Sequence, residues 1–294
     1  MRVLVLGATG YVGGSAARAL QARGHDVVGL ARSDDSAARL EAAGYAAVRG
    51  NLTDATSIAA AARQADGVVS AGFDRQNIGP AMQTSIVALL DALEGSGKPL
   101  VSCAGSLIYG DTRDRVVAET ERPTPPEWAT WAPLEDAVLA ARDKGIRSVL
   151  VRSPFLYGRG GGNFLPAFIG ASRQRGVGIY VGDGLNRWSA THVDDVGTLV
   201  AAAVERAEAG SVFVPASGQE PSFREIGASI SRLLGAGDRT ETWPVHEAAA
   251  AMGDWAYGIV VNQRFSTRAR ELLGWEPAGP AIFDEIERGS YSGA

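Results

Sequence analysis

The chain has 294 residues, 46% of them hydrophobic, and a formal net charge of −5. Such a chain is long and apolar enough to bury a large core, which argues against a disordered protein. The acidic charge, without any cluster of lysines and arginines, argues against nucleic acid and anionic membranes as partners. We therefore expect the partner to be a small-molecule substrate.

Several further classes of protein are disfavoured by residue counts and spacing. A single cysteine, Cys103, excludes an intramolecular disulfide. The N-terminal apolar stretch is too short for a signal peptide, and no run approaches the roughly 18 apolar residues of a membrane helix, so we expect a cytoplasmic protein. The three histidines lie too far apart for a metal site, and a G-x-S-x-G hydrolase motif is absent. We expect no bound metal.

Apolar stretches of strand length alternate with helical patterns over the first half of the chain. The expected strands are 2–6, 27–30, 45–48, 67–71, 99–103 and 147–152, and the intervening helices end near residues 24, 44, 64, 93 and 144. The last of these helices begins at about residue 127. Strands that are apolar throughout are typical of a parallel sheet covered by helices on both faces. Because crossovers are right-handed, the pattern predicts an α/β fold with a doubly wound parallel sheet, the Rossmann arrangement.

The pattern becomes less regular after residue 152. Residues 153–163 are predicted to form a glycine-rich loop, and a short strand then precedes a helix that begins near Asp194 or Asp195. A strand at 211–214 is a candidate to rejoin the sheet, a helix is expected at about 222–234, and two or three short helices follow. We predict a Rossmann domain at 1–156 together with about 186–215. A smaller C-terminal substrate-binding lobe would comprise 157–185 and 216–294.

The first strand-to-helix turn carries three regularly spaced glycines, Gly7, Gly10 and Gly13, within "VLVLGATGYVGGSAARAL". In a turn of this type the first glycine permits a tight bend and the second lets the backbone approach a pyrophosphate. The third allows the helix to pack closely on the strand. Because the helix N-terminus then faces the phosphates, the sequence predicts a dinucleotide-binding turn.

The end of the second strand indicates which dinucleotide is bound. A carboxylate at this place usually binds the ribose 2′-hydroxyl of NAD, whereas an arginine accommodates the 2′-phosphate of NADP. Here the strand is followed by Arg32 and Ser33, which favours NADP(H). Asp34 and Asp35 come directly after Ser33. If either carboxylate turns toward the ribose, NAD is the alternative cofactor.

Several stretches together resemble the extended and atypical short-chain dehydrogenase/reductases, the NAD(P)-dependent epimerase/dehydratase superfamily. They are "GATGYVGG", "GNLTDATSIAAAARQADGVVSAG", "SLIYGD", "VRSPFLYGRGGG" and "VGDGLNRWSATHVDDVG". The resemblance covers nearly the whole chain, and it is specific for fold and cofactor more than for reaction. It also implies a homodimer formed through helices beside the sheet.

The resemblance implies cofactor contacts in four segments: the glycine turn, the adenine side, the ribose side and the nicotinamide side. In that order, they are Thr9, Tyr11 and Val12; Asn51 and Leu52; Ser70, Ala71 and Gly72; and Pro154 and Phe155. By the same resemblance, Arg187 and Trp188 would line the substrate cleft, and Asp74 and Trp128 are further candidates for substrate binding. His192 is expected to have a structural role.

Reductases of this superfamily exchange a proton through a tyrosine, helped by a lysine four residues later and by a Ser or Thr at the end of the fifth strand. The resemblance places Trp128, Ala132 and Gly105 at these three positions, and none of them can exchange a proton. Misalignment does not restore the pair, because Glu94 and Ala140 precede the only two lysines by four residues. Ser106 is the candidate to replace the missing hydroxyl.

The sequence leaves three functions open. The first is an NADPH-dependent reductase of an activated C=C, C=N or quinone-like carbonyl, with the proton coming from Tyr109, Tyr157, a substrate hydroxyl or water. The second is a non-redox cyclisation, isomerisation or elimination with structural or vestigial NADP, and the third is an NADP-binding redox sensor. A hydrophobic or polycyclic substrate is suggested by the candidate cleft aromatics Trp128, Trp131, Phe155, Phe164 and Trp188.

Overall fold

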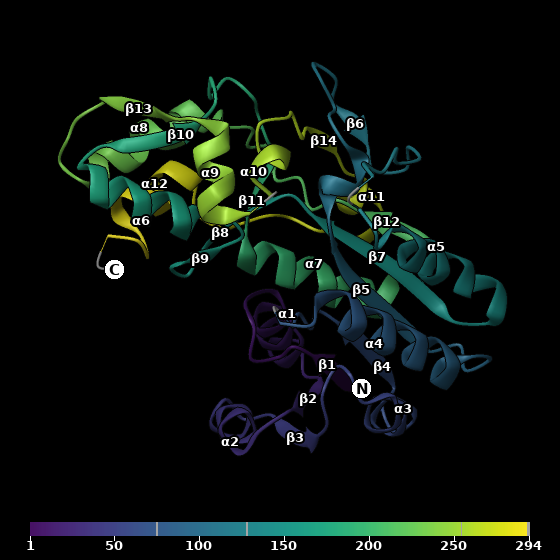
Figure 1. Cartoon of the computed structure of the whole chain (residues 1–294). Helices are drawn as coiled ribbons and strands as arrows, with labels where there is room; N and C mark the ends of the chain where they lie inside the picture. The colour runs from purple at the N-terminus through teal and green to yellow at the C-terminus, as the bar shows by residue number, and fades with distance from the viewer. Residues whose placement is uncertain (75, 128, 254, 293–294) are drawn as a thin grey trace.

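The computed structural model describes residues 1–74, 76–127, 129–253 and 255–292. Within them, seven parallel strands form the central sheet in the order β12-β7-β5-β4-β1-β2-β3 (Figure 1). Their bounds are β1 (Arg2–Leu6), β2 (Asp26–Ala31), β3 (Ala46–Arg49), β4 (Gly67–Ser70), β5 (Pro99–Gly105), β7 (Arg147–Ser153) and β12 (Ser211–Phe213). The doubly wound parallel sheet is therefore confirmed, and so is the return of the strand at 211–213.

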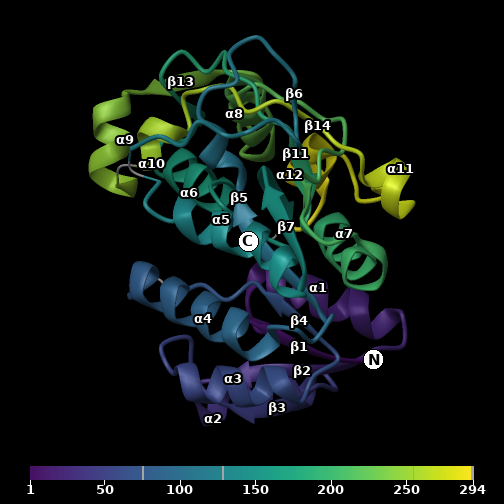
Figure 2. The same ribbon diagram turned by 90° about the vertical axis from the view of Figure 1, so that its right-hand side faces the viewer.

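Helices cover both faces of the sheet, as its continuous apolar strands require. Figure 2 shows α1 (Tyr11–Ala22) and α7 (Val193–Arg206) on one side, and α3 (Ala55–Arg63), α4 (Ile78–Leu93) and α5 (Ala132–Ala140) on the other. The helix α2 (Asp34–Ala42) packs against β2 and the edge strand β3. The face that carries α1 and α7 holds a continuous aliphatic core, and α3 and α4 close a second one.

The C-terminal half adds a lobe with small sheets and helices of its own (upper left in Figure 1). One sheet has β8 (Phe155–Gly158), β9 (Gly161–Gly162) and β11 (Ala190–His192), and another pairs β10 (Gly178–Val181) with β13 (Thr240–Trp243). The helices are α6 (Leu165–Arg175), α8 (Phe223–Leu233), α9 (Val245–Met252), α10 (Trp255–Gly258) and α12 (Ile282–Arg288). Beside the lobe, β6 (Val117–Ala118) pairs with β14 (Phe265–Ser266), which precedes α11 (Ala269–Leu273).

Aromatic rings form the core of this lobe. The ring of Trp188 meets those of Phe155, Phe164 and Phe223 edge-on, with centroids 5.7 to 6.4 Å apart. Edge-to-face pairs at this separation are favourable beyond the area they bury. The proposed division of the chain into a cofactor domain and a lobe stays a prediction. Among the described residues, no helix has the length and apolar character needed to cross a membrane.

Two predicted elements were wrong. The segment 153–163 is not a loop, because β8 pairs with β11 and turns back through Gly158 and Gly160, both at positive φ, into β9. The helix expected from residue 127 begins only at Ala132, with a proline in its first turn, and its last four residues, Ala141–Lys144, are a 3₁₀ turn. Proline is suited to the first turn of a helix because the missing amide has no partner there in any case.

Candidate functional site

The glycine turn after β1 is a close contact between backbone segments. Gly7 has a φ of +84°, and a Cβ on it would lie 2.6 Å from the carbonyl oxygen of Ala71, just after β4. A Cβ on Gly13 would lie 2.2 Å from the Gly7 carbonyl oxygen, which also accepts the Gly10 amide at 2.8 Å. These distances leave no room for side chains, so the roles predicted for the first and third glycines are consistent with the geometry.

The N-terminus of α1 opens onto this turn. Its N-cap, Gly10, has no side chain with which to cap the helix, and the residues of the first turn include no acid. The first amides of a helix have no intrahelical acceptor, and the helix dipole adds partial positive charge at this end. Together these features make the turn suitable for an anionic group such as a phosphate.

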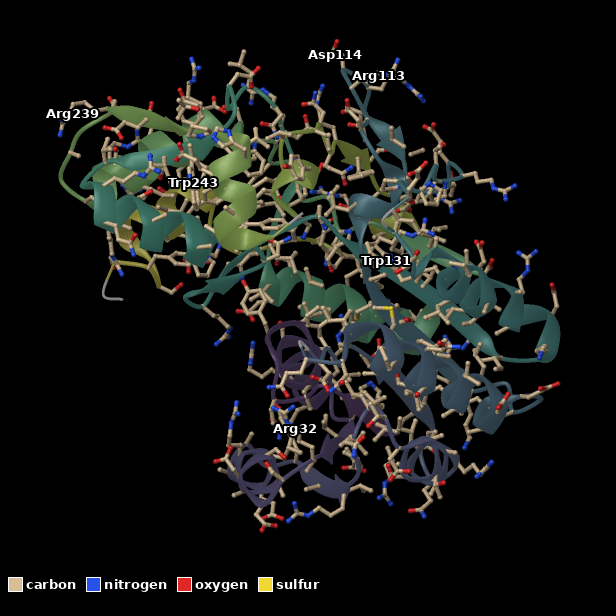
Figure 3. The ribbon with its side chains drawn as sticks, viewed as in Figure 1. Arg32, Arg113, Asp114, Trp131, Arg239 and Trp243 are labelled. Atoms are coloured by element: carbon tan, nitrogen blue, oxygen red, sulfur yellow. The ribbon has the colours of Figure 1, made fainter. Side chains whose placement is uncertain are left out.

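Charged side chains surround the turn on the side of β2. Arg32 follows β2, is exposed, and lies beside α1 and α2 in Figure 3. Asp34, the acid nearest to it in the sequence, is instead held in an ion pair by Arg49 at the end of β3. Ser33 caps α2 by accepting the Ser36 amide. Arg39, from α2, donates a hydrogen bond of 3.2 Å to the Thr9 carbonyl within the turn.

The predicted adenine and ribose segments meet at the carboxyl ends of the strands next to the turn. Leu52 packs so closely on Gly72 that a Cβ there would lie 2.7 Å from a Leu52 methyl group. The Asn51 side chain accepts the Thr53 amide at 2.7 Å, which stabilises its own loop. Ser70 is almost fully buried at the end of β4. The chain thus brings these predicted segments and the glycine turn together at one edge of the sheet.

Asp74 orders the segment that leads into α4. Hydrogen bonds from the Gln76 backbone and the Asn77 side chain, with a smaller contribution from the charge of Arg32, hold the pKa of Asp74 below its usual value. Asp74 thereby stabilises its own loop, and its contribution to substrate binding stays a prediction. Trp128, the other substrate-binding candidate of this region, lies outside the described residues.

The three hydroxyls predicted as catalytic are all buried and bonded within the protein. Ser106 donates to the Gln263 side chain at 2.8 Å. Tyr109 donates to the Glu119 carbonyl at 2.6 Å and accepts from Arg152 at 2.9 Å. Burial raises the pKa of Tyr109, although Arg152 acts in the opposite direction.

Tyr157 shows the same kind of environment. Its hydroxyl donates to the Pro280 carbonyl at 2.7 Å and accepts from Gln219 at 2.8 Å, and burial raises its pKa strongly. Such contacts are typical of residues that hold a lobe together. The geometry therefore argues against Ser106, Tyr109 and Tyr157 as proton donors, because each hydroxyl already has a protein partner and little access to a ligand.

Two aromatic residues predicted at the site have their rings elsewhere. Trp188 is 1% exposed, and its indole donates to the Val261 carbonyl at 2.7 Å. The ring of Phe155 is fully buried against Trp188. The prediction that these rings line a cleft is thus wrong, because the lobe needs them as its core. Phe164 belongs to the same cluster.

Arg187, which precedes Trp188, does reach the surface. It pairs with Glu225 at 3.0 Å and donates to the Glu220 carbonyl at 2.7 Å. It lines an open cavity of about 430 Å³ together with Asp114, Asp183, Leu185, Asn186, Val260, Asn262 and Arg264. The structural role expected for His192 is confirmed, because its buried ring caps α7 by accepting the Asp194 amide.

Sequence reasoning missed a buried ion pair under the carboxyl end of the sheet. Arg152 of β7 and Glu135 of α5 meet at 2.7 Å with side chains only 3% and 6% exposed. Burial raises the pKa of Glu135, although the charge of Arg152 opposes this shift. The signal was an arginine inside the apolar stretch "RSVLVRS", since a buried charge needs a partner.

Sequence reasoning also missed the contacts that hold the β8–β9 hairpin. The Tyr291 hydroxyl accepts the Gly158 amide at 2.6 Å and donates to the Gly161 carbonyl. Tyr11 of α1 donates to the Gly158 carbonyl at 2.9 Å. The C-terminal residues and the first turn of α1 therefore hold the same hairpin from two sides.

A doubly wound sheet with an uncapped helix behind a glycine turn defines a dinucleotide-binding fold. Residues 3–214 match the model of the NAD dependent epimerase/dehydratase family. A relative from Saccharomyces cerevisiae, described only as an uncharacterized protein, is 31% identical over 99% of both chains. The chain belongs to the NAD dependent epimerase/dehydratase family, and it is an enzyme of the NAD(P)-dependent oxidoreductase type.

Named relatives and solved structures agree with this assignment. A Stigmatella aurantiaca ketoreductase of a farnesylated dihydroquinoline oxide is 28% identical over 94% of this chain and 87% of its own. The NAD complex of Thermus thermophilus UDP-glucose 4-epimerase has a TM-score of 0.79 at 20% identity, over 100% of this chain and 99% of its own. A Streptomyces venezuelae dTDP-glucose 4,6-dehydratase mutant with NAD has a TM-score of 0.79 at 20% identity, over 99% of this chain and 96% of its own. At this identity, the structural matches support the fold alone.

Proposed function

We propose that the protein is an NADPH-dependent reductase of a hydrophobic small molecule that carries an activated C=C, C=N or quinone-like carbonyl group. The observation that carries the choice of cofactor is the placement of Arg32. It stands exposed beside the glycine turn, while the adjacent acid, Asp34, is held by Arg49. An arginine at this position favours a 2′-phosphate, and the Asp74 carboxylate whose charge interacts with Arg32 orders its own loop.

The residues present fit a pyridine dinucleotide. The amides of Tyr11, Val12 and Gly13 would bind the pyrophosphate, because they open the uncapped helix α1. The bare backbone at Gly7 and Gly13 leaves no side chain between this turn and the phosphates. When bound, the nicotinamide supplies the hydride, and the protein supplies orientation and a dry cleft.

Reduction rather than another reaction of the family is supported by two named relatives. One is the Stigmatella ketoreductase, and the other is the 2-alkyl-3-oxoalkanoate reductase of Stenotrophomonas maltophilia, 27% identical over 80% of this chain. An activated acceptor is favoured because the chain contains no Tyr-x-x-x-Lys pair. A conjugated or iminium acceptor needs less help from a protein acid, so water or a substrate hydroxyl suffices as the proton source.

Isotope transfer tests the reaction class. NADPH deuterated in turn on each face of the nicotinamide is supplied with isatin, chalcone or dihydroisoquinoline, which represent the three acceptor types. We expect deuterium on carbon in at least one product, from one of the two faces only. Product without label or cofactor consumption would instead indicate the non-redox alternative. Label in none of the three products would contradict the proposal.

The choice of cofactor is tested by Arg32→Asp. A charge-assisted hydrogen bond contributes about 1.5–3 kcal/mol, so we expect NADPH binding to weaken by about tenfold to a hundredfold. The affinity for NADH should change much less, because NADH has no 2′-phosphate. Arg113→Asp is the matched control, since Figure 3 shows Arg113 far from Arg32. Equal losses for the two cofactors would remove Arg32 from this role.

A further inference from the structure

Two serines of β7 have buried hydroxyl oxygens without a hydrogen-bond partner among the described residues. Buried polar groups are nearly always hydrogen-bonded, so each exception needs an explanation. The two lie at opposite ends of the strand. Ser148 is the second residue of β7 and is fully buried, whereas Ser153 is its last residue, at the carboxyl end of the sheet, and is partly exposed.

The neighbouring strand leaves an open space beside Ser153. In the parallel pairing of β5 with β7, Ser153 is the partner of Gly105. Paired residues of adjacent strands project from the same face, and the strands lie about 4.8 Å apart. Gly105 is exposed, and a Cβ on it would have nothing within 4 Å. Its φ of −110° and ψ of 148° are ordinary extended values, so its backbone does not require glycine.

This open space lies on the side of the sheet where the reacting half of a dinucleotide would be. Ligands of doubly wound sheets bind outside the carboxyl ends of the strands. Arg32 follows β2, on one side of β1, while Gly105 and Ser153 end β5 and β7 on the other side. A dinucleotide with its adenosine beside Arg32 and its phosphates at the glycine turn would therefore extend its nicotinamide toward β4 and β5.

We propose that Ser153 is a catalytic residue whose hydroxyl donates a hydrogen bond to the acceptor group of the substrate. Rotation about one side-chain bond would turn the oxygen from its unpartnered position toward the space over Gly105. The hydroxyl keeps its proton and stabilises the negative charge that develops on the carbonyl oxygen or imine nitrogen as the hydride arrives. The proton itself comes from water or from the substrate. This inference rests on the proposed function.

The test compares three variants. Ser153→Ala should lower kcat by about a hundredfold to a thousandfold, the usual effect of removing one such donor. NADPH affinity and the urea midpoint should not fall, because the lost oxygen has no protein partner. Ser148→Ala is the matched control, and its kcat should equal that of the wild type. In the Ser153→Ala background, Gly105→Ser should restore kcat at least tenfold, because it offers a hydroxyl from the paired strand.

The outcomes separate this inference from the proposed function. If the wild type transfers no deuterium to isatin, chalcone or dihydroisoquinoline, the proposed function fails, and Ser153 loses its role with it. If the wild type transfers label and Ser153→Ala retains full kcat, the inference alone is overturned. Equal losses of kcat in Ser153→Ala and Ser148→Ala would also overturn the inference. Should Ser153→Ala fold poorly, Ser153→Thr, which keeps a hydroxyl, must retain at least a tenth of wild-type kcat.

Discussion

Gly13→Ala tests whether the backbone contact at the glycine turn is needed for cofactor binding. The new Cβ would lie 2.2 Å from the Gly7 carbonyl oxygen and 2.6 Å from its carbon. Both are backbone atoms that cannot rotate aside, so α1 and the turn must separate by on the order of 1 Å to restore ordinary contact distances. Overpacking of this kind costs about 1–3 kcal/mol. We also expect NADPH binding to weaken at least tenfold, because the amides would no longer converge.

Gly170→Ala in α6 is the matched control. A Cβ on Gly170 would have nothing within 4 Å, so this variant should gain about 0.5–1 kcal/mol from helix propensity. Because both variants replace glycine by alanine in a helix, the propensity gain largely cancels between them. The difference in their free energies of unfolding, from urea titration, should therefore be about 1–3 kcal/mol. The NADPH affinity of both variants is measured by the quenching of protein fluorescence on titration with NADPH. Equal stability of the two variants, with unchanged NADPH affinity in Gly13→Ala, would refute the reasoning.

Two further predictions concern stability. Glu135→Leu leaves the Arg152 charge buried without its partner and should cost about 3–5 kcal/mol in urea unfolding. The double variant with Arg152→Met should recover most of that loss, and a double variant no more stable than the single one would contradict this explanation. Partial burial acts to raise the pKa of Glu225, but hydrogen bonds from Ser222 and the charge of Arg187 outweigh it and hold the pKa below its usual value. The ionised Glu225 therefore stabilises the fold at pH values above the ordinary pKa of a glutamic acid, and this stabilisation is lost as the pH falls through the lowered pKa. Glu225→Gln should be less stable than the wild type at neutral pH, with a gap that closes in acid; a gap independent of pH would refute the assignment.

The sheet could be predicted because its determinants are local. The strands β1 to β4 are short stretches rich in apolar residues, and each is followed by a helix that packs on the sheet. The segment 153–163 was mistaken because its glycines favour a loop, whereas its pairing partner, β11, begins only at Ala190. A strand that depends on a partner so distant in sequence has little local signal of its own.

The site was predicted in part for the same reason. The glycine turn and the place of Arg32 after β2 each depend on neighbours within a few residues, whereas the N-cap of α7 is His192 and the predicted Asp194 and Asp195 lie in the first turn. The position of a large side chain depends on residues distant in the sequence. Trp188 lies in the lobe core because the rings of Phe155, Phe164 and Phe223 contact it from three other segments. Tyr109 and Tyr157 remain candidates on sequence grounds, but only the fold shows that their hydroxyls accept hydrogen bonds from Arg152 and Gln219.

The amino-acid sequence by itself determined the order of strands and helices, the dinucleotide turn and the absence of a Tyr-x-x-x-Lys pair. These follow from residue spacing and from the conformations that glycine allows. Only the tertiary structure decided that Asp34 forms an ion pair with Arg49 and that the candidate hydroxyls are buried. It also decided that Ser153 lies beside the open space at Gly105. Such facts depend on which segments meet across the sheet, and a linear pattern carries no record of the pairing between distant strands.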